Sequence, residues 1–421
     1  MADPGGSGLR LVSSIRTAHK LTAHVPIAPP PIASPKRVVV VGAGAFGSAA
    51  ALELRGRGWS VVLLDQGPVP HDAAASTDVS KVVRMDYGSD VFYHELGEAA
   101  LEGWDRWNGD WPRPLYHQDG FLILSPGPMR PGGFEHESWR VLRERGYAPE
   151  RTGGEDLERR FPAWRGSGYP DGYFNPRAGW AESGAVVARL IELGRAAGVE
   201  LRSGACERIL STGSRVSGVA TVGGDRLDAD AVIVSAGAWT PQLLPSLSDT
   251  LWSTAQPVLH FRVADGRTFR GDGFPPWAAD ISGSGWYGFP ALADGTLKVA
   301  HHGPGRRAYP DQRGAVSDEH VERARVFLRS AIPAVADAPV VGRRVCMYCD
   351  AFDGDFLIDR DPDREGLVVA SGGSGHGFKF TPLIGCIVAD ALEGKGNRWG
   401  RRFRWRSPSG EVRIEEARFG G

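Results

Sequence analysis

The chain is short of cysteine, of long apolar runs and of net charge. Its four cysteines in 421 residues (Cys206, Cys346, Cys349 and Cys386) are too few for a disulfide framework, so we expect a reducing compartment and predict a cytoplasmic location. No uninterrupted apolar stretch reaches the roughly 18 residues that a membrane span requires. With 49 Lys and Arg against 50 Asp and Glu, the net charge is −1. We therefore expect neither a nucleic-acid partner nor a membrane.

The two ends differ in composition from the rest. Residues 1–35 carry Arg10, Arg16 and Lys20, no acid after Asp3, and a proline-rich run, but no apolar signal core. We interpret them as a disordered leader, with a transit peptide as the second interpretation. Residues 401–421 form a C-terminal extension whose basic run, Arg401–Arg406, is expected to be a solvated face.

At 421 residues and 45.2 kDa the chain exceeds the size of one core, so two domains are expected. Order begins at Lys36, because Arg37–Val41 is typical of a buried parallel strand and is stopped by glycine. A helix over 46–57 and a strand over 61–64 follow. This is the βαβ opening of a dinucleotide-binding fold.

The turn after the first strand has the spacing that suits a pyrophosphate. Its glycines permit a tight turn and close phosphate approach, and the following helix presents its positive N-terminal end. Asp65 lies 18 residues after the last glycine, near the position of a carboxylate that binds ribose, and Gln66 adjoins it. The motif alone does not distinguish NAD from FAD. The predicted binding residues of the turn are Gly42, Ala43, Gly44, Ala45, Phe46 and Gly47.

A second glycine-rich loop, Gly372–Gly377, leads from the predicted strand Leu367–Ala370 into a helix. A flavin that accepts a hydride becomes an anion, so its site needs fixed donors or cations. Backbone N–H groups of the loop and the charge of Lys379 supply them. Close packing of the loop alone is the other interpretation.

Cys346 is either a small buried hydrophobe or a thiolate that forms a thioether with the flavin. The pair Cys346 and Cys349 lacks the second pair of a zinc site, and its setting is not that of a redox motif. No metal is predicted.

With these motifs, from Arg37 to about Gly394, the chain resembles the monomeric sarcosine oxidase and N-methyltryptophan oxidase family of FAD-dependent amino acid oxidases. Pipecolate, saccharopine and fructosyl-amino-acid oxidases are relatives. The 33-residue step from Cys346 to Lys379 is similar to the family's spacing. The resemblance implies FAD held covalently by Cys346. It also implies that the turn Gly375-His376-Gly377-Phe378-Lys379 lies beside the flavin's pyrimidine ring.

The fold that the resemblance implies is α/β plus antiparallel sheet, with a Rossmann-like FAD domain and an antiparallel-sheet substrate domain. We assign residues 36–110, 180–253 and 341–400 to the FAD domain, and 111–179 and 254–340 to the substrate domain. Residues 112–176 show little periodicity and are expected to be loop-rich. The further cofactor contacts predicted are Ser80, Lys81, Ala236, Gly237, Trp239 and Tyr348.

A hairpin is predicted from Trp286–Leu292 and Thr296–His302. Strand alternation places Lys298 and His302 on one face, where they can point into one cavity. The resemblance implies that Lys298, eleven residues after Tyr287, assists the reaction with O₂. A solvent-facing lysine and a core tyrosine are the alternatives.

The segment Ser80–Tyr87 is similar to the family segment whose last basic residue, here Arg84, pairs with the substrate carboxylate. Lys379 would complete the clamp, and His376 is a further candidate. An exposed ion pair is the alternative for Arg84. Lys81 stands where the sarcosine enzymes carry arginine, which is similar to the saccharopine and fructosyl branches.

The sequence therefore predicts an FAD-dependent oxidase of a secondary-amine amino acid, such as an N-methyl amino acid or a cyclic imino acid. Hydride passes to the flavin, the imine hydrolyses, and O₂ becomes H₂O₂. The predicted partners are this small amine and O₂, in a monomer. A fructosyl-amino-acid or saccharopine oxidase, a dehydrogenase with another acceptor, and a flavin-binding interaction subunit remain as alternatives.

Overall fold

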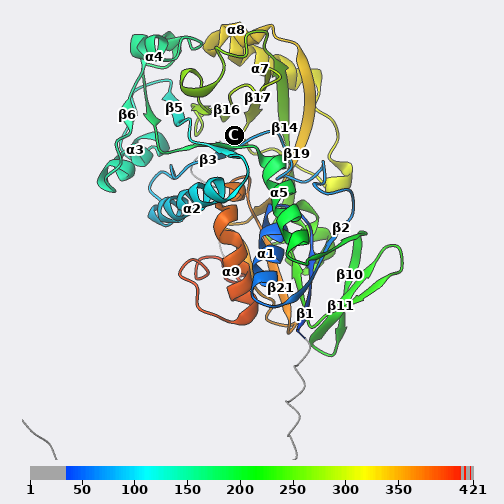
Figure 1. The fold of residues 1–421 in the computed structure, drawn as a ribbon. Helices are drawn as coiled ribbons and strands as arrows, with labels where there is room; N and C mark the ends of the chain where they lie inside the picture. The colour runs from blue at the N-terminus through cyan, green and yellow to red at the C-terminus, as the bar shows by residue number, and fades with distance from the viewer. Residues whose placement is uncertain (1–34, 409–411, 414–417, 419–421) are drawn as a thin grey trace, which may run out of the picture. The chain divides into compact units, whose positions relative to one another are not determined.

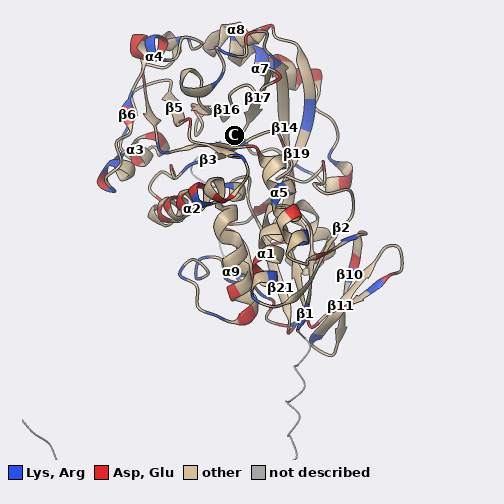
Figure 2. Cartoon of the chain, in the orientation of Figure 1, with Lys and Arg blue, Asp and Glu red and all other residues tan. Residues whose placement is uncertain are grey.

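The computed structural model describes residues 35–408, 412, 413 and 418 (Figure 1). Residues 1–34 of the predicted leader lie outside them. Basic and acidic residues are interspersed over the described elements, as Figure 2 shows, which agrees with the balanced charge.

The first sheet is built around the β-branched run after Arg37. Its order is β20-β21-β13-β1-β2-β9, and only the pair β20–β21 is antiparallel. Val38, Val39 and Val40 are fully buried because both faces of the sheet are covered. The strands are β1 (Arg37–Val41), β2 (Ser60–Asp65), β9 (Glu200–Ser203), β13 (Ala231–Val234), β20 (Leu357–Arg360) and β21 (Leu367–Ser371).

Alternate residues of these strands face two different layers. Val38 and Val40 pack toward three helices, whereas Val39 and Val41 pack toward a three-stranded antiparallel sheet. The helices are α1 (Ala45–Gly56), α5 (Ser183–Ala196) and α9 (Thr381–Glu393), near their predicted positions, and the small sheet has β10 (Cys206–Thr212), β11 (Arg215–Thr221) and β12 (Arg226–Asp228).

The second large sheet has nine strands, in the order β18-β14-β17-β16-β15-β5-β7-β6, with β19 also paired to β14. Leu297 and Val299 pack with residues of α7 (Asp318–Ala331) and α8 (Pro333–Ala336), and Lys298 points to the opposite face. The strands are β5 (Phe121–Ser125), β6 (Glu150–Arg151), β7 (Asp171–Asn175), β14 (Leu251–Arg262), β15 (Trp277–Ala279), β16 (Trp286–Gly288), β17 (Thr296–His301), β18 (Arg306–Arg307) and β19 (Val340–Ala351).

Two expectations are corrected by this sheet. Residues 112–176 are not mainly loop, because they supply β5, β6, β7, α3 (Phe134–Glu144) and α4 (Gly154–Arg160). Their periodicity was hidden because these are short elements separated by Gly and Pro turns. The segment 341–400 was assigned to the nucleotide-binding part, but β19 within it pairs along β14 in the nine-stranded sheet. Cys346 therefore lies on that sheet.

A separate three-stranded sheet has the order β3-β8-β4, and its strand β3 begins at Lys81. It has β3 (Lys81–Val83), β4 (Tyr116–His117) and β8 (Gly179–Ala181), and α2 (Val91–Asp110) and α6 (Thr240–Leu243) complete the helices. Arg84 follows β3 directly.

The basic C-terminal run is not a solvated face. Phe403 is fully buried, and Arg402 donates to Asp90 and Asp355. Arg406 binds Asp353. Carboxylates of the folded body thus neutralise these cations within the chain.

Arg418 also reaches the interior from the C-terminal extension. Its guanidinium is bidentate to Asp350, at 2.7 and 3.0 Å, and lies 5.5 Å from the ring centre of Tyr348. Both partners of this ion pair are buried.

We expect Arg418→Met to lower the free energy of unfolding by about 3–5 kcal/mol, because it leaves a buried carboxylate without its guanidinium. Urea denaturation measures this change. Arg413→Met, at an exposed arginine of the same extension, is the matched control. Adding Asp350→Asn should restore part of the loss, and no recovery in the double variant would contradict the ion-pair explanation.

Candidate functional site

The turn between β1 and α1 leaves no room for side chains. Gly42 has a φ of +102°, and a Cβ there would lie 2.5 Å from the Ser235 carbonyl oxygen. A Cβ at Gly47 would lie 1.8 Å from the Gly42 oxygen. The backbone can therefore approach a ligand closely in front of the N-terminus of α1. The N-cap residue of this helix is Gly44, which has no side chain to cap it.

Asp65 lies at the end of β2 beside this turn. Its Oδ2 accepts a 2.7 Å hydrogen bond from the backbone N–H of Ala43. From the neighbouring loop, the Ser76 hydroxyl accepts from the N–H of Ala45 at 3.1 Å. These contacts fix the turn, the strand end and the loop against one another.

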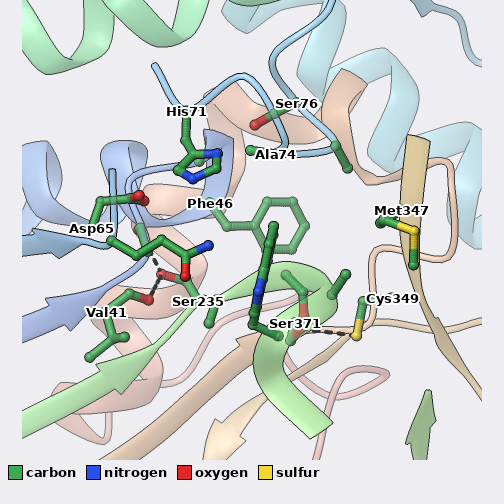
Figure 3. Close-up of a pocket in the computed structure, with 18 of the residues that line it drawn as sticks. Val41, Phe46, Asp65, His71, Ala74, Ser76, Ser235, Met347, Cys349 and Ser371 are labelled. Atoms are coloured by element: carbon green, nitrogen blue, oxygen red, sulfur yellow. Dashed lines mark hydrogen bonds between the residues drawn. The ribbon is translucent and has the colours of Figure 1, made fainter. Parts of the chain in front are cut away.

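An elongated cavity of about 500 Å³ runs from this turn toward β19 (Figure 3). In Figure 3 Asp65 lies on one side of the cavity and Met347 and Cys349 lie on the other, and Gln66, Glu207 and Tyr348 also line it. Of the predicted cofactor contacts, the cavity is lined by Gly42, Gly44, Ala45, Phe46, Asp65, Gln66, Lys81, Ala236, Gly237, Trp239, Tyr348, Gly375, Gly377 and Phe378. Ala43, Gly47, Ser80, Cys346, His376 and Lys379 are not among its lining residues.

A smaller cavity of about 70 Å³ adjoins the first. Four residues line both: Lys81, Tyr348, Gly375 and Phe378. Most of the other residues that line the smaller cavity have aromatic side chains, and two of them, Arg84 and Lys379, are cationic. Beyond the shared residues, the side chains at this cavity include Arg84, Phe121, Phe134, Trp277, Tyr287, Phe289, His302, His376 and Lys379.

Two of the predicted cations, Arg84 and Lys379, meet at this cavity, and both are buried. The Lys379 ammonium donates to the Tyr87 hydroxyl and to the His376 carbonyl, each at 2.8 Å. The Arg84 guanidinium lies 4.7 Å from the centre of the Tyr87 ring. Tyr87 therefore holds both cations in place.

Lys298 is buried but lines neither cavity. Its ammonium donates to Asp78 Oδ2 at 2.6 Å and to the Ser80 carbonyl at 2.8 Å. Burial lowers the pKa of Lys298 to about 8, against the opposing charge of Asp78. Burial by itself would raise the pKa of Asp78, but Lys298, His260 and Lys81 together hold it well below its usual range.

Lys81 connects this ion pair to both cavities. Its Nζ lies 4.0 Å from Asp78 Oδ2 and 3.9 Å from the Cys346 sulfur. Cys346 is 1% exposed and stands beside Tyr348 and Tyr287 in an apolar cluster. Cys349 faces the other side of β19 and accepts from the Ser371 hydroxyl at 3.3 Å. All four cysteines are free.

Tyr287 and the two predicted histidines also lie at the smaller cavity. The Tyr348 hydroxyl is 3.4 Å from His302 Nδ1. His376 is more constrained, since its ring bonds the Tyr87 hydroxyl and the Gly354 carbonyl, each at 3.0 Å. Burial and the neighbouring Tyr348 and Cys346 raise the pKa of Tyr287 well above its usual value.

Sequence reasoning missed three residues of this site: Tyr87, Asp78 and His260. Tyr87 ends the segment Ser80–Tyr87, and Asp78 lies three residues before Lys81, so proximity to the motif was their only signal. His260 has no local signal. It comes to the site because β14 pairs with β17, where it stands directly opposite Lys298.

Within the described residues no group of His, Cys, Asp and Glu could hold a metal ion. Among the helices of the same part of the chain, none is long and apolar enough to cross a membrane.

The residues present fit FAD. The turn lets a phosphate approach its backbone closely where any side chain would collide, and the long cavity extends from the Asp65 carboxylate to the wall where it shares Lys81 with the small cavity. These are the features that a dinucleotide with a reducible ring requires.

Comparison with known proteins gives the same result. The family model "FAD dependent oxidoreductase" (DAO) matches residues 37–391. Monomeric sarcosine oxidase from Bacillus sp. (strain B-0618) is 28% identical over 85% of this chain and 92% of its own length. N-methyl-L-tryptophan oxidase from Salmonella heidelberg (strain SL476) is 29% identical over 85% and 95%.

Among solved structures, the deglycating enzyme fructosamine oxidase from Aspergillus fumigatus (Amadoriase II) superposes with a TM-score of 0.82 at 26% identity. That similarity covers 93% of this chain and 94% of the other. The predicted fold class and enzyme class are confirmed. The chain belongs to the DAO family of FAD-dependent oxidoreductases.

Proposed function

We propose that the chain is an oxidase of an amino acid with a secondary amine, which transfers electrons through FAD to O₂ and releases an imine and H₂O₂. The observation that carries this proposal is the pair Arg84 and Lys379 at the small cavity that shares Gly375 and Phe378 with the long one. A carboxylate bound there holds the rest of an amino acid against the shared wall. Bound FAD supplies the acceptor for the hydride.

The chain's own residues orient the substrate. Arg84 binds a carboxylate bidentately, and Lys379, fixed by Tyr87, adds a second charge. The same cations disfavour a protonated amine nearby, so the amine binds in the neutral form from which a hydride can leave. No general base has to be named for this step.

The size and walls of the small cavity support a compact substituent on the amine. Its volume is about 70 Å³, and Phe121, Phe134, Trp277 and Phe289 lie around it. A sugar would bring hydroxyl groups against rings that cannot accept their hydrogen bonds. We therefore rank N-methyl and cyclic imino acids before sugar conjugates.

A fructosyl amino acid is the second candidate. Lys81, where the resemblance to sarcosine enzymes would give arginine, and the TM-score of 0.82 with a fructosamine oxidase both favour it. A peroxide-coupled assay over sarcosine, N-methyltryptophan, pipecolate and fructosyl-glycine tests the ranking. Turnover of fructosyl-glycine alone would reverse it, and turnover with less than one peroxide per substrate would favour a dehydrogenase.

We propose further that Cys346 holds the flavin covalently. Lys81, 3.9 Å from its sulfur, would stabilise the thiolate. The new C–S bond would replace a C–H bond of the ring methyl group, with the proton lost to solvent and the two electrons taken up by the flavin and then by O₂. We expect flavin fluorescence to stay with the protein band in denaturing electrophoresis, and Cys346→Ala to abolish it. Cys349→Ala, a buried cysteine on the same strand, is the control. A fluorescent band in the Cys346 variant would contradict the linkage.

A further inference from the structure

The buried ion pair of Lys298 and Asp78 has a third member that the proposed reaction does not use. His260 Nε2 lies 3.3 Å from Asp78 Oδ1, on the oxygen opposite the one that Lys298 binds. The order is therefore His260, then Asp78, then Lys298. Each side chain is within hydrogen-bond reach of the next.

Exposure changes in one direction along this series. The side chain of His260 is 12% exposed, that of Asp78 is 1% and that of Lys298 is 0%. His260 lines neither of the two cavities, so its exposed edge meets solvent by another route. That edge remains wet when a cofactor and a substrate fill both cavities.

The fold holds His260 in this position. It stands opposite Lys298 on β17 and opposite Gly342 on β19, so the three share one face of the sheet. A Cβ at Gly342 would lie 2.8 Å from His260 Nδ1, which means that only glycine leaves room for the ring.

We propose that His260 and Asp78 are a proton route that supplies the oxygen half-reaction, and this inference rests on the proposed oxidase function. Reduction of O₂ to H₂O₂ consumes two electrons and two protons. The reduced cofactor provides both electrons and one proton, so the second proton must enter from water. A buried site closed by substrate or product needs a path for it.

The protons and bonds balance along the route. Lys298 gives an N–H proton to the oxygen product and becomes a neutral amine. The loss of that charge raises the proton affinity of Asp78, so protonated His260 transfers its Nε2 proton to Oδ1. The carboxyl group then turns so that the protonated oxygen faces Lys298, and this oxygen returns the same proton to the amine. His260 then takes a proton from water. Among the described residues, the other charged or titratable groups that face the route include Lys81 on β3, Tyr287 on β16 and Cys346 on β19.

The test is rapid mixing of the anaerobically reduced holoenzyme with O₂ at several pH values. We expect His260→Asn to slow reoxidation by about tenfold or more above pH 8, where free protons are scarce, and to leave reduction by substrate unchanged. Added imidazole should restore the rate. The control is His117→Asn. His117 also faces a carboxylate, that of Glu182 at 3.0 Å, and its replacement should leave the reoxidation rate unchanged.

A second readout does not depend on turnover. In protein labelled with ¹⁵N-histidine, Asp78→Asn should change the NMR chemical shift of His260 Nε2, because it removes the carboxylate oxygen that faces this nitrogen at 3.3 Å. Unchanged reoxidation in His260→Asn over the whole pH range overturns the route, and so does slowing that imidazole does not relieve. A wild-type enzyme that does not reoxidise with O₂ instead overturns the proposed function.

Discussion

Replacing Lys298 by Met should slow flavin reoxidation by O₂ about 10²–10³-fold and leave the reduction by substrate nearly unchanged. The first electron passed to O₂ makes an anion, and a fixed positive charge in a dry site stabilises it strongly. Lys298 is such a charge, fully buried and held by Asp78 and the Ser80 carbonyl. Stopped-flow measurement of the two half-reactions separates the effects.

The single variant has a side effect that the structure identifies. Without Lys298, the buried carboxylate of Asp78 loses its 2.6 Å partner, which costs stability. The double variant Lys298→Met with Asp78→Asn removes both charges and is the matched control. It should be more stable than the single variant and equally slow with O₂. Equal losses in both half-reactions would remove the assigned role of Lys298.

The pH dependence of reoxidation has a definite sign. The pKa of Lys298 is about 8, so its charge is present below that pH and is lost above it. Reoxidation should therefore fall as the pH rises through about 8, whereas Lys298→Met should be slow at every pH. A rate that rises through this range would contradict a role for the ammonium charge.

The features that could be predicted from the sequence are those whose residues lie close together along the chain. The βαβ opening was predictable because Arg37–Val41, the glycine turn and Asp65 lie within 29 residues and each has a simple physical reason. Phe46, Gly375 and Phe378, which were predicted to contact the cofactor, line the long cavity and lie within seven residues of the ends of the buried strands β1 and β21.

Contacts that strand pairing creates were not predictable from the sequence. Strand alternation correctly placed Lys298 and Val299 on opposite faces of the sheet. Lys298 was also expected to point into the cavity, but it does not line the cavity and its ammonium is bound to Asp78. Its partner is 220 residues away in sequence, and no periodicity indicates such a pair. The same holds for Arg418, which no sequence pattern relates to Asp350.

The solvated interpretation of the basic C-terminal run failed for a related reason. Charge patterning describes the run alone, but its carboxylate partners Asp90, Asp353 and Asp355 come from other segments. With Arg402 and Arg406 occupied inside the chain, the run offers less charge to a partner protein. This weakens the interaction-subunit alternative and strengthens the enzyme interpretation.

The second large effect is expected at Arg84. Arg84→Lys keeps the charge but removes the planar fork that pairs with both oxygens of a carboxylate. We expect kcat/KM to fall about 100-fold, equivalent to about 3 kcal/mol, because one of the two charge-assisted hydrogen bonds to the buried carboxylate is lost. FAD content should not change, since Arg84 lines only the small cavity. Steady-state kinetics and the visible spectrum measure both.

The substrate's own chemistry provides the decisive control. For the wild type, replacing the substrate carboxylate by its amide should reduce kcat/KM by a similar factor, because the amide has one acceptor oxygen and no charge. The Arg84→Lys enzyme should distinguish acid from amide much less, since the two changes remove the same contact and their effects are not additive. Arg140→Lys is the control for a general effect of replacing arginine by lysine. Arg140 forms a partly exposed ion pair with Glu144 on α3 and lines neither cavity. Full additivity of the two losses would mean that Arg84 acts on something other than the carboxylate, and the clamp with Lys379 would have to be abandoned.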